Sequence, residues 1–286
     1  MSNIYVRYFR VVGLVFLGLA LLILWIGPYF SGTKLINPIF LYLGGWQIHW
    51  YGLLMVVAVV AGWYWLDKLA KRTYLVNKTL DLIVWVALGG LVGARLLFVL
   101  LKLSEFSGQW QSIFSLSQGG LSIHGALIGG LVATFIYCRH NQLSFSKTLD
   151  MLVLPVLIGQ VIGRWGNFFN QEAFGGPTNL VWKMYVAPKF RPEGYANYNF
   201  FHPTFLYEAI GLGLIIWLII RLRKQSLSAG TLTIIYLISY SVLRFGIEFF
   251  RLDSDKLWQL TLAQWGSLLI IMGGVIIGLI LKKKRL

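Results

Sequence analysis

Residues 163–176 read GRWGNFFNQEAFGG at the end of a long apolar run. This stretch places Arg164, Asn167 and Glu172 where the chain leaves that run. A charged side chain at bilayer depth costs about 2.5–3.5 kcal/mol on insertion scales, so an arginine at this position indicates a functional site. The four glycines of the stretch allow backbone and ligand to approach closely. The stretch therefore predicts a polar site at the end of a transmembrane helix.

The composition of the whole chain indicates a membrane protein. Of its 286 residues, 57% are hydrophobic and only 12% are charged, and the mean hydropathy is +0.71. Such a chain has too little polar surface for a soluble domain of this size. We therefore expect an all-α fold, a polytopic integral membrane helix bundle with about eight transmembrane helices. The apolar runs lie near 11–30, 49–67, 79–101, 119–138, 148–168, 204–221, 230–250 and 262–281.

Basic residues predict the orientation of these helices. Most of the 25 Lys and Arg residues fall in segments on the side of the N-terminus, including the cluster at 282–285. Cytoplasmic segments carry such an excess, so we expect both termini in the cytoplasm. The net charge of +15 is then explained by topology and by attraction to anionic membrane lipid, and no nucleic-acid partner is expected.

Two segments of the chain need an interpretation of their own. The run near 11–30 follows Arg7 and Arg10, and we interpret it as a retained helix. A signal peptide is the alternative, but the run is long for one and no small-residue cleavage site follows it. The stretch 171–203 is the longest non-membrane segment, and its Trp and Tyr residues favour an outer cap at the membrane interface.

Polar side chains gather at the outer ends of five expected helices. All backbone groups must be satisfied within lipid, so these side chains are expected on helices. Their gathering on one side predicts a site at the outer face. In chain order they are His49 and Tyr51, His124, Arg164 with Asn167, Asn170 and Glu172, His202 with Tyr207 and Glu208, and Arg244 with Glu248.

Several motifs together resemble those of the prolipoprotein diacylglyceryl transferase family. They are the stretch 163–176, HWYG at 49–52, SIHGALIGG at 122–130, HPTFLYE at 202–208 and RFGIEFFR at 244–251. The family comprises bacterial membrane enzymes that move the diacylglyceryl group of phosphatidylglycerol onto a cysteine of a lipoprotein precursor. The resemblance covers roughly 37–281, and Ala126 departs from it where a glycine is common.

The resemblance implies a division of the chain and a place in the cell. A seven-span transferase domain would occupy 37–286, with the outer loop 171–203. Residues 1–36 would form an extra N-terminal transmembrane helix and an outer linker. The protein would lie in the bacterial cytoplasmic membrane, with its active site toward the outer side. Its partners would be phosphatidylglycerol, the surrounding membrane lipid, and prolipoprotein signal peptides that carry a lipobox cysteine.

The resemblance also implies roles for individual residues. Catalytic roles fall to His124, Arg164, Arg244 and Tyr51. Substrate-binding roles fall to Arg164, Asn167, Asn170, Glu172, Gly175, Glu248 and Arg244. Neither a metal ion nor another cofactor is expected.

The residue types suit this reaction. Guanidinium groups hold a phosphate through paired hydrogen bonds and stabilise the charge that builds on it. A thiolate attacks far better than a thiol, so a base that works near neutral pH is needed. His124 is the expected base. Tyr51 is the competing candidate, although a phenol with an ordinary pKa of about 10 is seldom ionised at neutral pH.

Other interpretations stay open at this point. Arg244 and Glu248 are four residues apart on one helix face and could form only a charge-cancelling pair. Arg95 is interpreted as a structural charge, His49 as an interfacial residue, and Cys138 as a small packing residue. Two other functions also fit the chain, a transporter for an anionic solute and a different intramembrane lipid-processing enzyme.

Overall fold

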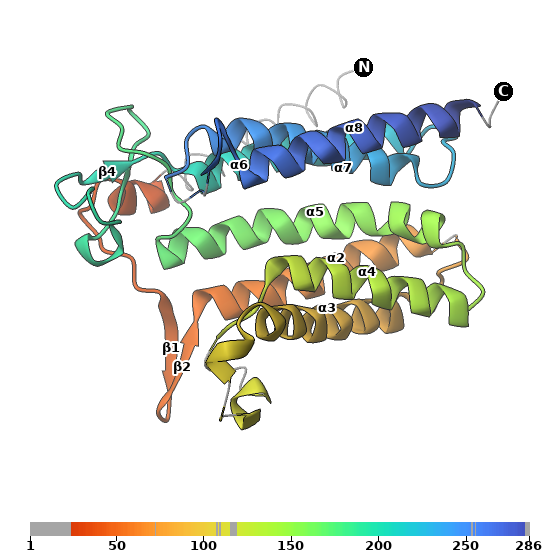
Figure 1. The fold of residues 1–286 in the computed structure, drawn as a ribbon, viewed down its shortest axis with the longest axis horizontal. Coiled ribbons are helices and arrows are strands. Elements are labelled where there is room, and N and C mark those ends of the chain that lie inside the picture. Colours follow the sequence, from red (N-terminus) through yellow and green to blue (C-terminus); the bar gives the residue numbers. More distant parts are fainter. Residues whose placement is uncertain are drawn as a thin grey trace, which may run out of the picture.

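The computed structural model describes residues 24–71, 73–106, 108, 110–114, 119–252, 254 and 256–283. Long helices run side by side and are joined by turns and loops at their two ends (Figure 1). Residues 24–30 are helical as well, whereas the preceding part of the expected first span lies outside the described residues. The helices are α2 Trp50–Ala70, α3 Thr79–Leu101, α4 Ile123–His140, α5 Phe145–Asn170, α6 Thr204–Leu222, α7 Thr231–Glu248 and α8 Leu262–Lys283.

Six of these helices are long and apolar enough to cross a membrane: α2, α3, α5, α6, α7 and α8. The prediction of an all-α, multi-pass membrane protein is thereby confirmed. Helix α4 is not among the six, because its 18 residues include His124 near the start and Arg139 and His140 at the end. It nevertheless packs along α3 over much of its length and belongs to the same bundle.

Helix α5 occupies the centre of the bundle. It lies between a group formed by α2, α3 and α4 and a second group formed by α6, α7 and α8 (Figure 1). The last turn of α5, the first turns of α2 and α6 and the last turn of α7 meet at one end of the bundle, which we call the site end. The polar residues expected to form the site therefore belong to helix ends that face the same way.

Aspartate at the opposite end fixes α7 against α5. The Asp150 carboxylate in α5 accepts hydrogen bonds from the backbone N–H of Gly230 at 2.7 Å and of Thr233 at 2.8 Å, and from the Thr233 hydroxyl at 2.7 Å. These are otherwise unsatisfied N–H groups at the start of α7, so the carboxylate caps that helix from another one. The Asp150 carboxylate thus sets the position of α7 relative to α5, and with it the relative positions of their polar ends.

Short hairpins lie at the site end, and the sequence did not predict them. Strands β1 Ile39–Leu43 and β2 Trp46–His49 form an antiparallel pair that leads directly into α2. Two smaller pairs join β3 Met184–Tyr185 to β4 Phe200–Phe201, and β5 Lys256–Leu257 to β6 Leu260–Thr261. Short 3-10 helices, η1 Leu103–Phe106, η2 Trp110–Phe114 and η4 Pro188–Phe190, complete the loops.

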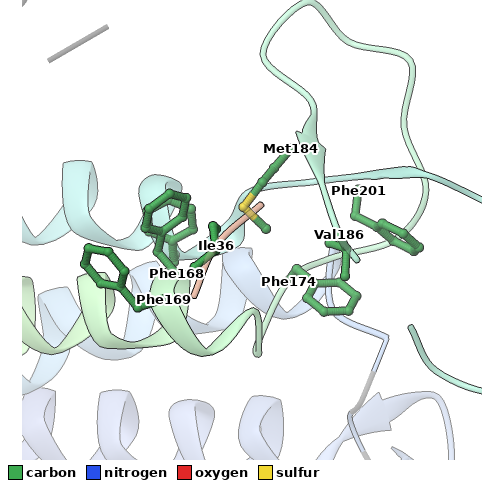
Figure 2. Packing of buried hydrophobic residues seen from close by; sticks show 8 residues of the cluster. Ile36, Phe168, Phe169, Phe174, Met184, Val186 and Phe201 are labelled. Carbon is green, nitrogen blue, oxygen red and sulfur yellow. The ribbon is translucent and has the colours of Figure 1, made fainter. Parts of the chain in front are cut away.

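An aromatic core joins the end of α5 to residues 171–203, which we call the cap. Phe168 and Phe169 of α5 pack with Phe174, Met184, Val186 and Phe201 (Figure 2). Residues before the first strand join this core, because Ile36 is buried there and the rings of Tyr29 and Phe30 contact Phe168 edge-on or tilted. The cap is therefore an ordered structure that is packed on the bundle. Its packing fixes the backbone on which the polar residues of 163–176 stand.

Helices α3 and α4 pack through glycine. A Cβ atom added to Gly93 would collide with the carbonyl oxygen of Gly125, and one added to Gly129 would collide with that of Gly89. The two backbones are thus in direct contact, as small residues permit in membrane helices. The glycines of α4 therefore serve close packing in a continuous helix.

We predict that Gly129→Ala destabilises the protein. The new methyl group would have to push α3 and α4 apart, and such overpacking costs about 1–3 kcal/mol. The thermal midpoint of the detergent-solubilised protein should therefore fall. The matched control is Gly273→Ala in α8, where a Cβ meets nothing within 4 Å. A Gly129→Ala variant as stable as this control would show that the close approach is not needed.

Candidate active site

The end of α5 carries two different faces. Gln160, Arg164 and Asn167 follow each other at helical spacing and form a polar stripe. Trp165, Phe168 and Phe169 lie on another side of the same helix and enter the aromatic core under the cap. The aromatic face anchors the helix, and this anchoring holds the polar face in a fixed orientation.

Arg164 is held in place by a carboxylate from α6. Its Nη1 lies 3.2 Å from Oε2 of Glu208, near the start of α6. Only 3% of the Glu208 side chain is exposed, and its second oxygen accepts a hydrogen bond of 3.1 Å from the Tyr240 hydroxyl of α7. A buried carboxylate needs such partners, because an unpaired charge is strongly destabilising in a dry site. The network ties α5, α6 and α7 together at the level of Arg164.

Arg244 forms a second ion pair one helical turn from this network. Its Nη2 lies 2.6 Å from Oε2 of Glu248, whose side chain is 1% exposed. Tyr240, Arg244 and Glu248 are spaced four residues apart and lie on one face of α7. The charge-cancelling pair that the spacing of Arg244 and Glu248 allows therefore exists, and Tyr240 connects its helix face to Glu208.

Both arginines keep donor capacity. The Arg164 Nε and the Arg244 Nη1 are buried atoms without a hydrogen-bond partner among the described residues. Buried polar groups are almost always paired in folded proteins, so such groups indicate a missing ligand or water. About a fifth of each arginine side chain is exposed, so a ligand can reach both ion pairs. Two guanidinium groups with unused N–H groups are suited to an anionic oxygen ligand.

Glu172 organises the asparagines of the stretch. Its Oε1 accepts hydrogen bonds from the Asn167 amide at 2.9 Å and from the Asn170 amide at 3.3 Å. The chain turns sharply here because Gln171 and Ala173 both have a left-handed backbone, with φ of 49° and 54°. The turn brings Glu172 back over the last turn of α5. The three residues predicted to bind substrate thus form one hydrogen-bonded group.

Gly175 lies at a crowded junction of three segments. A Cβ atom there would meet the Phe250 carbonyl oxygen at 2.5 Å and side-chain carbons of His202 and Thr204 at 2.9 Å. Its own N–H donates to the His202 carbonyl at 2.9 Å. Only glycine fits this close approach of the cap to α6 and α7. The predicted role in substrate binding stays a prediction, and the contacts found here are structural.

Tyr51 lies next to the polar stripe. It is the second residue of α2, and its ring covers Gly166, where a Cβ atom would be only 2.7 Å from the ring. Because Gly166 has no side chain, the Tyr51 ring can lie directly against α5. Gly166 stands between Arg164 and Asn167 in the sequence. Tyr51 is 38% exposed.

His124 is at the site end, on a helix that packs against α3 and α5. It is the second residue of α4, exposed, and makes no hydrogen bond with the residues that the structure describes. The apolar run 119–138 predicts His124 inside its helix, but α4 begins only at Ile123, with Ser122 as its N-cap. The exposed side chain can be reached from the loop before α4, as a base for the substrate thiol requires. Its role as a base stays a prediction, because no contact within the described chain tests it.

Arg95 has the structural role expected of it. Its guanidinium donates to the carbonyl oxygens of Ile113 and Ser112, each at 2.6 Å, and of Gly119 and Gly120 at 2.8 and 2.9 Å. It thereby fastens the loop between α3 and α4 and sets where α4 begins. Arg95 therefore stabilises the fold through hydrogen bonds to the backbone of this loop.

His202 fastens the cap to the bundle. Trp182 donates to the Tyr207 hydroxyl at 2.8 Å, and that hydroxyl lies 3.0 Å from Nδ1 of His202. Because the hydroxyl accepts from Trp182, its own proton is free to go to Nδ1. Burial lowers the pKa of His202 from its usual value, which favours the neutral ring that such an arrangement needs.

A cleft of about 580 Å³ opens beside the asparagine group. It combines the end of α5 with segments that are distant in the sequence, and His49, expected at the membrane interface, forms part of its wall. Among the described residues, no three His, Cys, Asp or Glu side chains come together as metal ligands. Six of the residues that line the cleft are His49, Asn170, Glu172, Phe174, Phe190 and Leu252.

The fold and the site define a class of protein. This is a multi-pass membrane protein in which α5 and α7 bring two ion-paired arginines to one end of the bundle. A family model described as prolipoprotein diacylglyceryl transferase matches residues 38–280. The chain belongs to this family.

Curated relatives support the same assignment. The chain is 39% identical over 255 residues to a protein of Gloeobacter violaceus, covering 88% of this chain and 93% of the relative. It is 40% identical over 269 residues to one of Synechocystis sp., covering 90% and 94%. It is 37% identical over 268 residues to one of Thermotoga maritima, covering 92% and 91%. Each of these relatives is named phosphatidylglycerol–prolipoprotein diacylglyceryl transferase.

Proposed function

We propose that this chain transfers the diacylglyceryl group of phosphatidylglycerol to the lipobox cysteine of prolipoproteins. The product is a thioether, and glycerol phosphate is released. Membership of the transferase family supports the reaction. The observation that carries it in the structure is the pair of arginines, Arg164 and Arg244, whose unused N–H groups suit a lipid phosphate.

The arginines act where charge develops. In the reaction a bond forms between the cysteine sulfur and a glycerol carbon, and the bond between that carbon and a phosphate oxygen breaks. The electron pair of the broken bond leaves with glycerol phosphate, whose phosphate gains one negative charge. Arg164 and Arg244 stabilise this charge, and Glu208 and Glu248 keep them in place. A low-dielectric site makes this stabilisation larger than it would be in water.

The remaining site residues position the substrates. The thiol proton passes to His124, directly or through water, and Tyr51 lies beside the lipid site and orients it. Glu172 holds the amides of Asn167 and Asn170, which are available to the glycerol hydroxyls. Glu248 acts mainly through Arg244, because it lies 2.6 Å from that guanidinium and is buried.

We place the site end on the outer side of the bacterial cytoplasmic membrane, with both termini in the cytoplasm. The basic residues at the other end of the bundle, such as Lys68, Arg139 and Arg221, support this orientation. We also keep the division into an added segment 1–36 and a transferase domain 37–286. The start of the family match at residue 38 supports that division.

Reporter fusions test this topology. A fusion after Leu286 should be active only with a reporter that works in the cytoplasm. A fusion within 178–200, inside the cap, should be active only with a reporter that works outside the membrane. The reverse pattern at either position would contradict the orientation and the outward-facing site.

The transporter and the other lipid-processing enzyme are not favoured. A transporter would place its polar groups near the middle of the membrane between two related halves. Here the ion pairs and the asparagine group lie at one end of the helices, and the family is one of transferases. The proposed function can be tested by complementation. The chain should restore modification of prolipoproteins in a bacterium depleted of its own transferase, and an Arg164→Ala chain expressed at the same level should not.

A further inference from the structure

We propose that the 580 Å³ cleft at the site end binds the acceptor polypeptide just after its cysteine. The proposal rests on the proposed transfer to a prolipoprotein and goes further by assigning a place to the acceptor chain. The hydrophobic part of a signal peptide lies in the membrane before the cysteine. The chain that follows the cysteine must therefore leave the site on the same side as the cap.

The cleft is connected to the lipid site through α5. Asn170 and Glu172 line it, and Glu172 accepts a hydrogen bond from Asn167 at 2.9 Å. Asn167 lies one turn beyond Arg164 on the same stripe of the helix. A polypeptide in the cleft would thus begin next to the residues that surround the reacting atoms.

The charges of the cleft favour a polypeptide over a phosphate. Among the described residues that line it, Glu172 alone carries a full charge at neutral pH. Lys189 and Arg191 are close in sequence to the lining, but each already has a partner, which for Lys189 is the ring of the wall residue Phe190. The Lys189 ammonium lies 4.7 Å from the centre of the Phe190 ring, and Arg191 donates to the carbonyl oxygens of Val186 and Ala196. The released glycerol phosphate, which is anionic, is poorly matched to such a wall.

The walls supply apolar contacts for a chain. Phe190 of the cap and Leu252 beyond α7 are partly buried against the aromatic core and face the cleft together with Phe174. Apolar walls with a few polar groups are typical of sites that bind ligands, and the polar groups fix orientation. We therefore expect side chains of the acceptor to contact Phe190 and Leu252, while an amino or amide group contacts Glu172.

Two acceptor peptides test the proposal with the full-length protein in detergent–lipid micelles. The short one ends one residue after the cysteine, and the long one continues for about five residues, enough to fill the cleft at about 3.3 Å per residue. Leu252→Ala and Phe190→Ala should each raise the KM for the long peptide about tenfold, the effect of losing one buried apolar contact. The KM for the short peptide, the KM for phosphatidylglycerol and kcat should not change. The matched control is Trp258→Ala, which removes an 87% exposed ring at the same end of the bundle outside the cleft.

The charge of the acceptor gives a second readout that needs no variant. A long peptide with Lys two positions after the cysteine should have a KM about two- to fivefold below that of the same peptide with Asp, and salt should reduce the difference. Equal KM values for the two peptides would contradict the role of Glu172. A photoreactive residue at that position should cross-link to the cap near Phe190 or to the segment at Leu252. Cross-links that map elsewhere would overturn the proposal even if the variants fold poorly.

The outcomes separate this proposal from the proposed function. Transfer to both peptides with no effect of the cleft variants would disprove the acceptor site and leave the transferase intact. An equal increase in KM for the short and the long peptide would also disprove it. The absence of thioether with either peptide and the wild-type protein would instead contradict the proposed function itself.

Discussion

Replacing Arg164 with alanine should lower transferase turnover by roughly 30- to 1,000-fold, which corresponds to about 2–4 kcal/mol of lost transition-state stabilisation. The variant removes a guanidinium with a buried, unused Nε and also leaves Glu208 without its cation. Arg244→Ala should act in the same range, because its Nη1 is also unused and Glu248 would be left buried and unpaired. Steady-state assays with phosphatidylglycerol and a lipobox peptide measure both effects.

Lysine is the informative control for these variants. It keeps the charge but lacks the planar fork that binds two oxygens at once, so Arg164→Lys should recover little activity. An Arg164→Lys enzyme with near-normal turnover would contradict the proposed two-point contact with the phosphate. Protein stability should be compared in parallel. A Glu208→Gln variant keeps the shape of the side chain and removes the charge, so a loss of activity at unchanged thermal stability would show that this carboxylate positions Arg164.

Replacing His124 with glutamine should remove the step that activates the thiol, with a loss of about 100- to 10,000-fold, as is usual for a general base. In the wild-type enzyme the rate at limiting peptide should rise with pH and reach a plateau once the base is unprotonated. In the variant this plateau should disappear, and the rate should keep rising toward the ordinary pKa of a cysteine thiol, about 8.5. Full pH profiles of kcat/KM measure this.

Tyr51→Phe separates the two candidates for the base. The ring of Tyr51 packs on Gly166, so phenylalanine keeps the packing and removes only the hydroxyl. The rate should fall, and the plateau should stay. A His124→Gln enzyme with nearly full activity and an unchanged profile would show that the base has been assigned wrongly. The exposure of His124 and its lack of a partner within the described chain make this test necessary.

The sequence predicted the helices well because their signal is local. Apolar runs of sufficient length identify transmembrane helices, and six of them were found where expected. The polar ends of α5 and α7 could also be predicted, since Arg164 and Arg244 stand out in apolar surroundings. The expectation that several helices bring polar groups to one end agrees with the direction in which α2, α5, α6 and α7 run.

Contacts between distant segments could not be predicted in the same way. Glu208 lies 44 residues from Arg164, and nothing in the periodicity of α6 indicates which cation it meets. Tyr240 is one of several aromatic residues in its helix, and nothing local indicates that its hydroxyl donates to Glu208. The cleft combines His49, Phe190 and Leu252, which belong to three separate segments. The short hairpins were not predicted, because strands of two to five residues show too little alternation of apolar and polar side chains.

Following both products in a purified system tests the transfer directly. The wild-type protein, phosphatidylglycerol labelled in its headgroup glycerol and a lipobox peptide should yield a diacylglyceryl thioether on the peptide cysteine and one labelled glycerol phosphate for each thioether. A peptide with serine in place of cysteine should yield neither product. Glycerol phosphate released without thioether, or thioether formed equally well by the Arg164→Ala protein, would contradict the proposed transfer and the role of Arg164 in it.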